Sequence, residues 1–363
     1  MSKFHKKTSS SFLTTINPEL PMLIRGSRMV PYALLLTLGV TIASPAFAQE
    51  VNLYTTREPG LMKPLMDGFT KATGITVNSI FVKDGLAERV AAEGTQSPAD
   101  VLMTVDIGNL IDLVEKGLAQ PVQSPVLEKA IPANLRGKDN QWFTLSTRAR
   151  VLYAAKDLKL TSFSYEDLAD PKWKGRVCIR AGQHPYNTAM IAAFLAKHGE
   201  ARTEQWLRGI KANLARKATG GDRDVARDII GGICDIGIGN SYYVGLMRSG
   251  SGGADQKKWG EGIDVVLPTF AGGGTQVNIS GAALARHSPN RAAAQRFLEY
   301  LVSDDAQKIY AEMNFEHPVK AGAPIHPIIA ALGTLQVDPL PLTEIARHRA
   351  VASKLVDKVG FDQ

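Results

Sequence analysis

The sequence lacks the short motifs that mark common enzyme and nucleotide-binding sites. Its 363 residues contain no G-x-S-x-G elbow, no P-loop, no H-E-x-x-H spacing and no G-x-G-x-x-G that opens a helix. Asp222 and Asp224 form an acidic pair in "GGDRD", but acids at such a place are typical of a helix start. An enzyme that uses Asp222 or Asp106 in a cleft therefore has no supporting motif, and we expect a protein that is not an enzyme.

The sequence also lacks clusters of Lys and Arg interleaved with aromatic residues, which are typical of nucleic-acid-binding proteins. In total, 42 basic residues outnumber 35 acidic ones. Five of the basic residues and one acidic residue precede residue 49, so the remaining chain has 37 basic and 34 acidic residues and a net charge of +3. We expect no nucleic-acid partner, and the mild positive bias is compatible with an anionic ligand.

Long apolar runs are absent after residue 48, so no later segment is long enough to span a membrane. Before it, Arg25 and Arg28 precede an uncharged apolar stretch over residues 30–43, which is shorter than the ~20 residues that a span requires. The tripeptide "AFA" at 46–48 then forms a small-x-small cleavage signal. The pattern predicts a cleavable signal peptide over residues 1–48 and export to a bacterial periplasm.

Cysteine is scarce, with Cys178 and Cys234 the only two in the chain. Each lies in an apolar, strand-like run, "GRVCIR" and "GGICDIG", and neighbouring strands could bring them together. An even pair in an oxidising compartment favours a disulfide. Two buried thiols on separate strands are the alternative.

What the sequence does contain is a regular alternation of strands and helices. Apolar runs predict strands at 51–54, 75–82 and 101–104, and helical spacing predicts helices at 61–72, 85–93 and 109–116. This alternation predicts an α/β lobe with a mainly parallel sheet. The chain is expected to cross to a second lobe near residue 150 and to return near residue 275. The predicted N-terminal lobe comprises residues 49–147 and 276–363, and the C-terminal lobe comprises residues 148–275, with a cleft between them.

Polar groups follow three of the expected strands, in "TTREPG" at 55–60, "GQHPY" at 182–186 and "SYY" at 241–243. Ligands of open α/β sheets bind beyond the carboxyl ends of the strands, so these groups should meet in the cleft. The tyrosine pair of "SYY" is expected where a strand gives way to a loop.

The oxygen donors among these groups are Tyr186, Tyr242, Tyr243 and Glu58, and such donors suit a hard metal ion. A phenol has a reference pKa of about 10, so only a strongly Lewis-acidic cation such as ferric iron would displace several phenol protons together. His184 precedes Tyr186 by two residues and is expected to lie in a surface turn rather than to ligate. The alternative interpretation is that the tyrosines form an aromatic wall for an organic ligand.

Longer stretches of the sequence resemble a known family. "VNLYTTREPG", "SPADVLMTVDIGNL", "RARVLYAAKD", "LADPKWKGRVCIR" and "GICDIGIGNSYYVGLM" are similar to the periplasmic ferric-ion-binding proteins, the substrate-binding components of bacterial iron ABC importers. The resemblance extends from about residue 51 to residue 320, and "SYY" together with the upstream "PYN" is its most specific part. It implies an α/β, two-lobe periplasmic binding protein fold with mixed, mainly parallel sheets and a hinge of crossover strands.

The resemblance also implies the metal ligands. The family's adjacent tyrosine pair falls on Tyr242 and Tyr243, and its third tyrosine falls on Tyr186. Many relatives have a His-Tyr pair after the arginine of the first loop, whereas Arg57 is followed here by Glu58 and a proline. Glu58 therefore either supplies a carboxylate to the metal or only lines the cleft.

An arginine of "RAR" is expected to hold a synergistic anion such as carbonate beside the ferric ion. Arg148 is favoured, although the sequence does not separate it from Arg150, and Arg57 and Arg223 are expected to contact the anion or to lie behind the ligands. The resulting prediction is a monomeric shuttle that captures Fe(III) and delivers it to an inner-membrane ABC permease. The alternative is a binding protein for a small organic cation such as thiamine or a polyamine.

Overall fold

The computed structural model describes residues 49–363, so the predicted signal peptide over residues 1–48 lies outside the described residues. The strands are β1 (Glu50–Thr55), β2 (Thr76–Phe81), β3 (Val101–Thr104), β4 (Ala119–Gln120), β5 (Phe143–Ala155), β6 (Val177–Cys178), β7 (Ile236–Asn240), β8 (Ile263–Val266), β9 (Val277–Ala285) and β10 (His317–Pro318). The first seven α-helices are α1 (Pro59–Thr73), α2 (Leu86–Glu93), α3 (Ile107–Glu115), α4 (Pro125–Ala130), α5 (Pro185–His198), α6 (Glu200–Asn213) and α7 (Asp222–Ile230). They are followed by α8 (Ser241–Ser249), α9 (Ala254–Gly262), α10 (Arg291–Leu301), α11 (Asp304–Glu312), α12 (Pro327–Ala330) and α13 (Leu342–Lys358). None of the helices in this described part is both long and apolar enough to cross a membrane.

The strands form one sheet in the order β2-β1-β3-β9-β5-β7-β6, in which β4 pairs with β9 and both β8 and β10 pair with β5. The pairs β1–β2, β1–β3 and β6–β7 are parallel, and the remaining pairs are antiparallel. The α/β class and the mixed sheet predicted from the sequence are confirmed, but the parallel share is smaller than predicted. The reason is that β5 and β9 each run antiparallel to the strands beside them.

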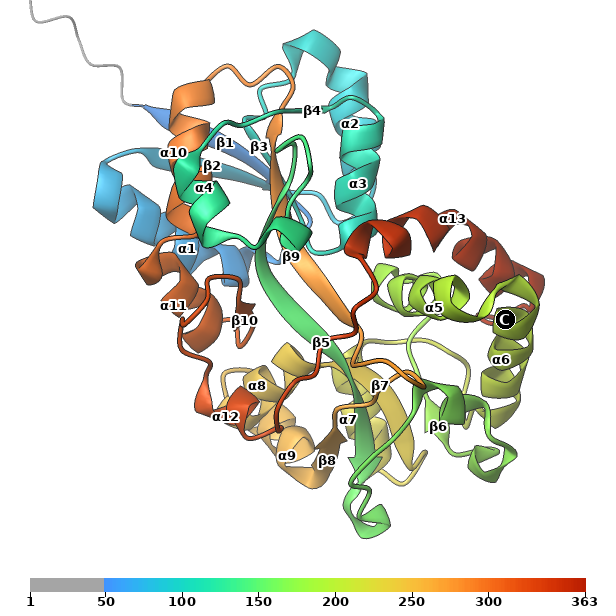
Figure 1. The fold of residues 1–363 in the computed structure, drawn as a ribbon. Helices are drawn as coiled ribbons and strands as arrows, with labels where there is room; N and C mark the ends of the chain where they lie inside the picture. Colours follow the sequence, from blue (N-terminus) through green and yellow to red (C-terminus); the bar gives the residue numbers. More distant parts are fainter. Residues whose placement is uncertain (1–48) are drawn as a thin grey trace, which may run out of the picture. The chain divides into compact units, whose positions relative to one another are not determined.

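Strand β5 joins the two parts of the sheet. Its first half pairs with β9, with Thr147 opposite Ile279, and its second half pairs with β7, with Arg150 opposite Asn240. Figure 1 shows β5 extending from the neighbourhood of β9 and β3 to that of β7 and β8. Two adjacent strands thus cross between the parts near residues 150 and 277, where crossovers were expected. The division of the chain between two lobes stays a prediction.

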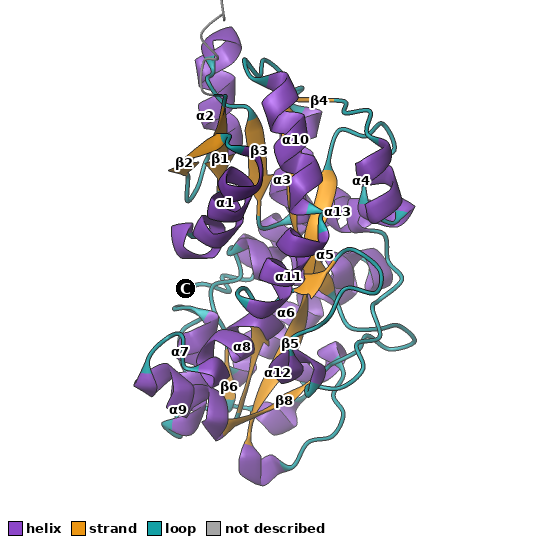
Figure 2. Cartoon of the chain, turned by 90° about the vertical axis from the view of Figure 1, so that its left-hand side faces the viewer, coloured by secondary structure: helices purple, strands orange, loops and turns teal. Residues whose placement is uncertain are grey.

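Alternating side chains explain how helices cover both faces of the first part. Leu53 of β1 and Val101 of β3 join an apolar cluster with Phe69 of α1 and with α10. Their sequence neighbours, Tyr54 and Leu102, join a separate cluster with α2 and α3 on the opposite face. Successive residues of a strand point to opposite faces, so a strand buried on both sides is apolar throughout. Figure 1 shows β1 and β3 between α10 on one side and α3 on the other, and Figure 2 shows the same strands turned by 90°.

Helix α13 packs against α5 and also contacts α3 and α6 (Figure 1). The sequence predicted residues 276–363 as part of the N-terminal lobe, yet α5 and α6 come from the segment predicted for the C-terminal lobe. Helix α13 therefore contacts helices from both predicted lobes. Its Arg349 side chain lies directly against Gly108 of α3, where an added Cβ would approach the Arg349 Cδ to 2.5 Å.

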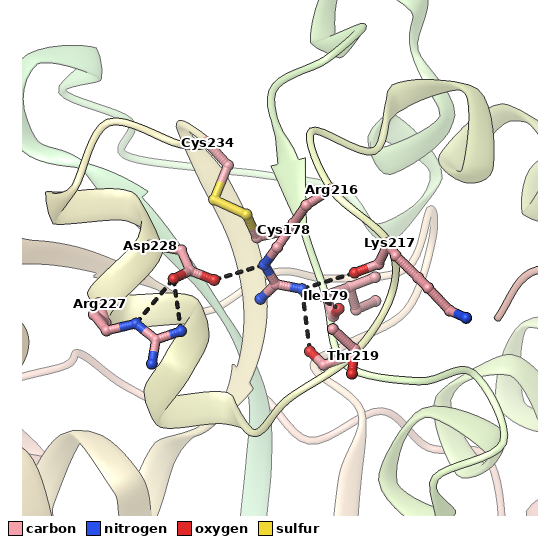
Figure 3. Close-up of a disulfide and its surroundings, with 8 residues drawn as sticks. All are labelled: Cys178, Ile179, Arg216, Lys217, Thr219, Arg227, Asp228 and Cys234. Atoms are coloured by element: carbon pink, nitrogen blue, oxygen red, sulfur yellow. Dashed lines mark hydrogen bonds and ion pairs between the residues drawn. A yellow bond between two sulfur atoms is a disulfide. The ribbon is translucent and has the colours of Figure 1, made fainter. Parts of the chain in front are cut away.

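A disulfide joins Cys178 and Cys234, the pairing that the sequence favoured, with Cα atoms 5.8 Å apart. Figure 3 shows it between β6 and the turn that precedes β7, and both residues are buried. Beside it, Arg216 donates to the Asp228 carboxylate at 2.6 Å and to the Thr219 carbonyl at 3.1 Å. The disulfide thus joins β6 to the turn before β7, and Arg216 joins α7 to the segment after α6.

Candidate metal centre

Strand β7 passes directly into helix α8, so Tyr242 and Tyr243 lie in the first turn of a helix. The predicted loop is therefore wrong. Asn240 ends the strand with an extended backbone (φ −86°, ψ 144°) and occupies the N-cap position of the helix that begins at Ser241, without a capping hydrogen bond from its side chain. Gly, Asn and Ser favour turns and helix caps alike, so the sequence "GNS" did not distinguish a loop from an immediate helix. The two rings pack side by side, with centroids 4.1 Å apart.

Tyr186 occupies the corresponding place in helix α5. Pro185 is the first helical residue, and the His184 side chain caps the helix by accepting a hydrogen bond from the Tyr186 N–H at 3.2 Å. The phenol oxygens of Tyr186 and Tyr242 are 3.4 Å apart. The structure thus brings the predicted tyrosines to one place from two helix starts that are far apart in the sequence.

The tyrosines line a cavity of about 240 Å³. Their exposed fractions are 8% for Tyr186, 5% for Tyr242 and 8% for Tyr243, so the phenols are nearly removed from bulk water. The same cavity is lined by Glu58, Arg57, Arg148, Arg180, Lys83 and Glu316. Oxygen donors and cationic side chains therefore share one small space.

Burial controls the protonation of the phenols. It raises the pKa of Tyr242 well above the ordinary value, and the neighbouring Tyr186 and Tyr243 raise it further, while Arg148 opposes them. Burial likewise raises the pKa of Tyr243. At neutral pH both phenols therefore carry their protons, and a metal that binds them as phenolates must displace those protons.

Glu58 lies at the exposed rim of the cavity. It stands at the N-cap position of α1 but makes no side-chain capping hydrogen bond there. His184 closes the turn at 182–184, as predicted, but it is half-buried, lines the cavity and caps α5 rather than lying free at the surface. Burial and the nearby Arg180 lower the pKa of His184 to about 3, so its imidazole is neutral at physiological pH.

Arg148 and Arg57 meet at one wall of the cavity. Both donate to the Ser280 hydroxyl, at 2.9 Å and 2.6 Å, and Arg57 forms an ion pair with Glu316 at 3.1 Å. Arg148 is 3.5 Å from the same Glu316 oxygen, and its guanidinium carbon lies 5.3 Å from the centre of the Tyr186 ring. The Nε atoms of Arg57 and Arg148 are buried without a hydrogen-bond partner among the described residues. This wall therefore holds two buried guanidinium groups beside one carboxylate.

Arg150 lies behind the cavity rather than in its lining. It donates to Asp222 at 2.6 Å, to the Asn240 side chain at 3.0 Å and to the Asn187 side chain at 2.5 Å. Asp222 also accepts from the Asn240 N–H at 2.9 Å. Burial would raise the pKa of Asp222, but Arg150 and Arg180 hold it below its usual value. These contacts link the residue after Tyr186 to the end of the strand before Tyr242.

The acidic pair of "GGDRD" separates into two functions in the structure. Asp222 enters the buried ion pair with Arg150, whereas Asp224 accepts from the Gly221 N–H at 2.7 Å in a capping arrangement at the start of α7. Arg223, predicted near the anion, lies with its guanidinium carbon 5.2 Å from the centre of the Tyr243 ring. It also contacts Gln256 at 3.4 Å.

Arg180 and Glu316 were missed in the sequence. Arg180 lies over the Tyr186 ring at 5.2 Å and pairs with Asp222 at 3.2 Å. A signal for it existed, because Arg180 closes the run "VCIR" at a predicted strand end. Glu316 had no such signal, since it follows α11 at a point with no turn motif and meets Arg57 across 259 positions of sequence.

Among residues 49–363, no group of three or more His, Cys, Asp and Glu side chains is arranged to hold a metal ion. The donors that do converge are phenols, which are hard oxygen ligands and suit a strongly Lewis-acidic cation.

Comparisons with known proteins identify the family of the chain. Residues 54–308 match the family model described as "Bacterial extracellular solute-binding protein". The chain is 40% identical over 320 residues to "Iron uptake protein A2" of Synechocystis, which covers 87% of this chain and 91% of that protein.

Two solved structures are similar over most of the chain. One is a Bordetella ferric binding protein, with a TM-score of 0.80 and 64% identity, covering 87% of this chain and 100% of that one. The other is a Trichodesmium protein solved in complex with iron and citrate ligands, with a TM-score of 0.80 and 40% identity, covering 86% of this chain and 99% of that one. The chain therefore belongs to the periplasmic ferric-ion-binding proteins, within the bacterial extracellular solute-binding proteins. Proteins of this family bind solutes and are not enzymes, which confirms the non-catalytic prediction.

Proposed function

We propose that the protein binds ferric iron in the cavity through phenolate oxygens of Tyr186, Tyr242 and Tyr243. The observation that carries this proposal is the convergence of three buried phenols on one cavity, with two of their oxygens 3.4 Å apart. Three phenolates balance the charge of Fe(III). Hard oxygen donors favour Fe(III) over the softer Fe(II).

An anion completes the site in this proposal. Arg148 and Arg57 each have a buried Nε without a partner among the described residues, and one carboxylate, Glu316, faces both guanidinium groups. The excess positive charge suits carbonate or another small carboxylate-like anion. The Trichodesmium relative holds citrate with its iron, which supports an anion of this chemical class. Glu58, at the rim, is the candidate for a further oxygen donor.

Iron binding should release protons, because burial raises the pKa of Tyr242 and Tyr243 and both phenols are protonated in the iron-free protein. Each tyrosine that ligates loses one proton, so protons compete with iron and the affinity falls as the pH falls. This provides a physical route for release in addition to docking. In the proposed function the protein is a monomeric periplasmic shuttle that delivers iron to an inner-membrane ABC permease.

The alternative cargo, a small organic cation such as thiamine or a polyamine, fits this cavity poorly. Four cationic side chains, Arg57, Arg148, Arg180 and Lys83, line it against three carboxylates, Glu58, Asp84 and Glu316, so an organic cation, which does not turn the phenols into phenolates, meets a net positive lining. The tyrosine rings could stack on such a ligand, but the net charge of the cavity lining has the same sign as the ligand.

The proposal is tested by replacing each of the three tyrosines with phenylalanine and measuring iron affinity by competition with citrate. Each replacement removes a ligand, so we expect a loss larger than the 10–100-fold that is typical of residues that only orient a ligand. Tyr300→Phe is the matched control, since Tyr300 lies on α10 away from the cavity lining. Unchanged affinity in all three cavity variants would overturn the proposed site.

A further inference from the structure

The loop that leads into Tyr186, residues 180–184, is held on one side by its own helix. The Asn187 amide donates to the carbonyls of Arg180 at 2.9 Å and Ala181 at 3.1 Å. The Thr188 hydroxyl donates to the Gly182 carbonyl at 3.0 Å. These contacts satisfy carbonyl groups, but they leave the N–H groups of the loop to find other acceptors.

Asp362 supplies those acceptors from the other side. Its carboxylate accepts hydrogen bonds from the backbone N–H of Gly182 at 2.6 Å and from that of Gln183 at 3.0 Å. Neither N–H group has another acceptor within residues 49–363. Hydrogen bonds to a carboxylate are stronger than those between neutral groups, so one side chain fixes two consecutive peptide units.

Helix α13 reinforces the contact through the Gln183 side chain. The amide nitrogen donates to the Ser353 carbonyl at 2.9 Å and to the Asp357 carboxylate at 2.8 Å. The Ser353 hydroxyl donates in return to the Gln183 side-chain oxygen at 2.8 Å.

Gly182 allows the close packing that brings Asp362 into range. A Cβ at residue 182 would lie 2.9 Å from side-chain atoms of both Phe361 and Val356, which are buried. The loop before Tyr186 therefore rests against the segment after α13, which is separated from it by about 180 residues in sequence.

We propose that Asp362 is a positioning residue for Tyr186. Its carboxylate fixes the peptide units of Gly182 and Gln183, and these set where helix α5 begins and where the Tyr186 phenol stands relative to Tyr242. Metal ligands must be held within about 0.5 Å of their productive geometry, so loss of this anchor should weaken binding without removing any ligand. The inference rests on the proposed function, because it treats Tyr186 as an iron ligand.

The test compares iron affinity in Asp362→Ala, Asp362→Asn and the unsubstituted protein. Loss of two charge-assisted hydrogen bonds should lower the affinity about tenfold in Asp362→Ala. Asp362→Asn keeps one oxygen acceptor and should lose less. Lys358→Met is the matched control, since it removes the ion pair between the last residue of α13 and Glu204, close in sequence to Asp362, and leaves the loop contacts intact.

Repeating the Asp362→Ala substitution in the Tyr186→Phe protein distinguishes a positioning effect on Tyr186 from general destabilisation of the fold. In the Tyr186→Phe protein, Asp362→Ala should cause no further loss of iron affinity, because the residue acts through the Tyr186 phenol. An equal loss in both backgrounds, or no loss in either, would overturn the inference. If Tyr186→Phe lowers affinity while Asp362→Ala does not, only the positioning inference fails. If Tyr186→Phe itself leaves affinity unchanged, the ligand assignment of Tyr186 fails and the positioning inference with it.

Discussion

Arg148 and Arg150 are two residues apart on β5, and both side chains are only 1% exposed, yet they have different surroundings. Arg150 donates to three side chains, including Asp222, and its charge is neutralised inside the fold. Arg148 donates to a hydroxyl and a carbonyl, and the carboxylate nearest to it already pairs with Arg57. Residues two apart share a face of a strand, so burial and orientation alone do not separate them. The two arginines differ in their hydrogen-bond and ion-pair partners, which come from distant parts of the sequence.

The comparison teaches that a buried charge can serve the fold or the ligand. A buried arginine that pairs with a close carboxylate, as Arg150 does with Asp222, stabilises the arrangement around it, because its removal leaves a charge unpaired. A buried arginine whose nearest carboxylate already pairs with another arginine, as for Arg148, keeps the capacity to bind an anion. We therefore assign the stabilising role to Arg150 and the anion-binding role to Arg148.

The largest expected effect is on stability, in Arg150→Met. Asp222 would stay buried with the longer contact to Arg180 as its remaining ion pair, and breaking a buried pair costs about 3–5 kcal/mol. Urea unfolding of the iron-free protein measures the loss. Arg148→Met is the matched variant, and it should cost less because Glu316 keeps Arg57 and Ser146 as partners. Equal losses in the two variants would remove the distinction between the arginines.

The next effect is on binding, in Arg148→Met. Without this guanidinium the anion loses its main partner, and iron affinity in bicarbonate should fall by about 10–100-fold, as for other residues that support a metal ligand. The measurement is a citrate competition assay with and without bicarbonate. The bicarbonate dependence should disappear in this variant. Its persistence would show that the anion binds elsewhere.

The smallest effect is expected for His184→Asn, which keeps a side chain able to cap α5. The pKa of His184 is lowered to about 3, so the imidazole is already neutral throughout the range above that pH. Acid release of iron should therefore follow the phenols, and its midpoint should not move in the variant. The midpoint is read from iron loss during a pH titration. A clear shift would mean that His184 titrates in the iron-bound protein.

Local patterns predicted much of the fold. The strand at 101–104 has those bounds in the structure because it is a continuous apolar run, and the helix predicted at 85–93 is Leu86–Glu93 because Gly85 and Gly94 bound it. The helix that carries Tyr242 and Tyr243 was missed, since it follows its strand without a connecting loop and the residues at the junction are turn formers. Short-range signals thus identified the elements but not this direct junction.

In the candidate site, too, the sequence did not predict contacts between residues that are far apart along the chain. Tyr186, Tyr242 and Tyr243 could be selected because each follows an expected strand end. The sequence could not choose between Arg148 and Arg150, nor find Glu316 or Asp362, since these depend on contacts between residues more than 70 positions apart. Helix α13 illustrates the same point, because it packs on α5, which comes from a distant part of the sequence.

The central claim is that the three tyrosines bind ferric iron as phenolates. The most direct measurement is a visible absorption titration of the protein with ferric citrate, with and without bicarbonate. The account predicts a saturable phenolate-to-iron charge-transfer band at one iron per protein, which weakens in Tyr242→Phe and Tyr243→Phe and persists in Tyr300→Phe. No band at equimolar iron would contradict it, and the tyrosines would then be walls for a different cargo.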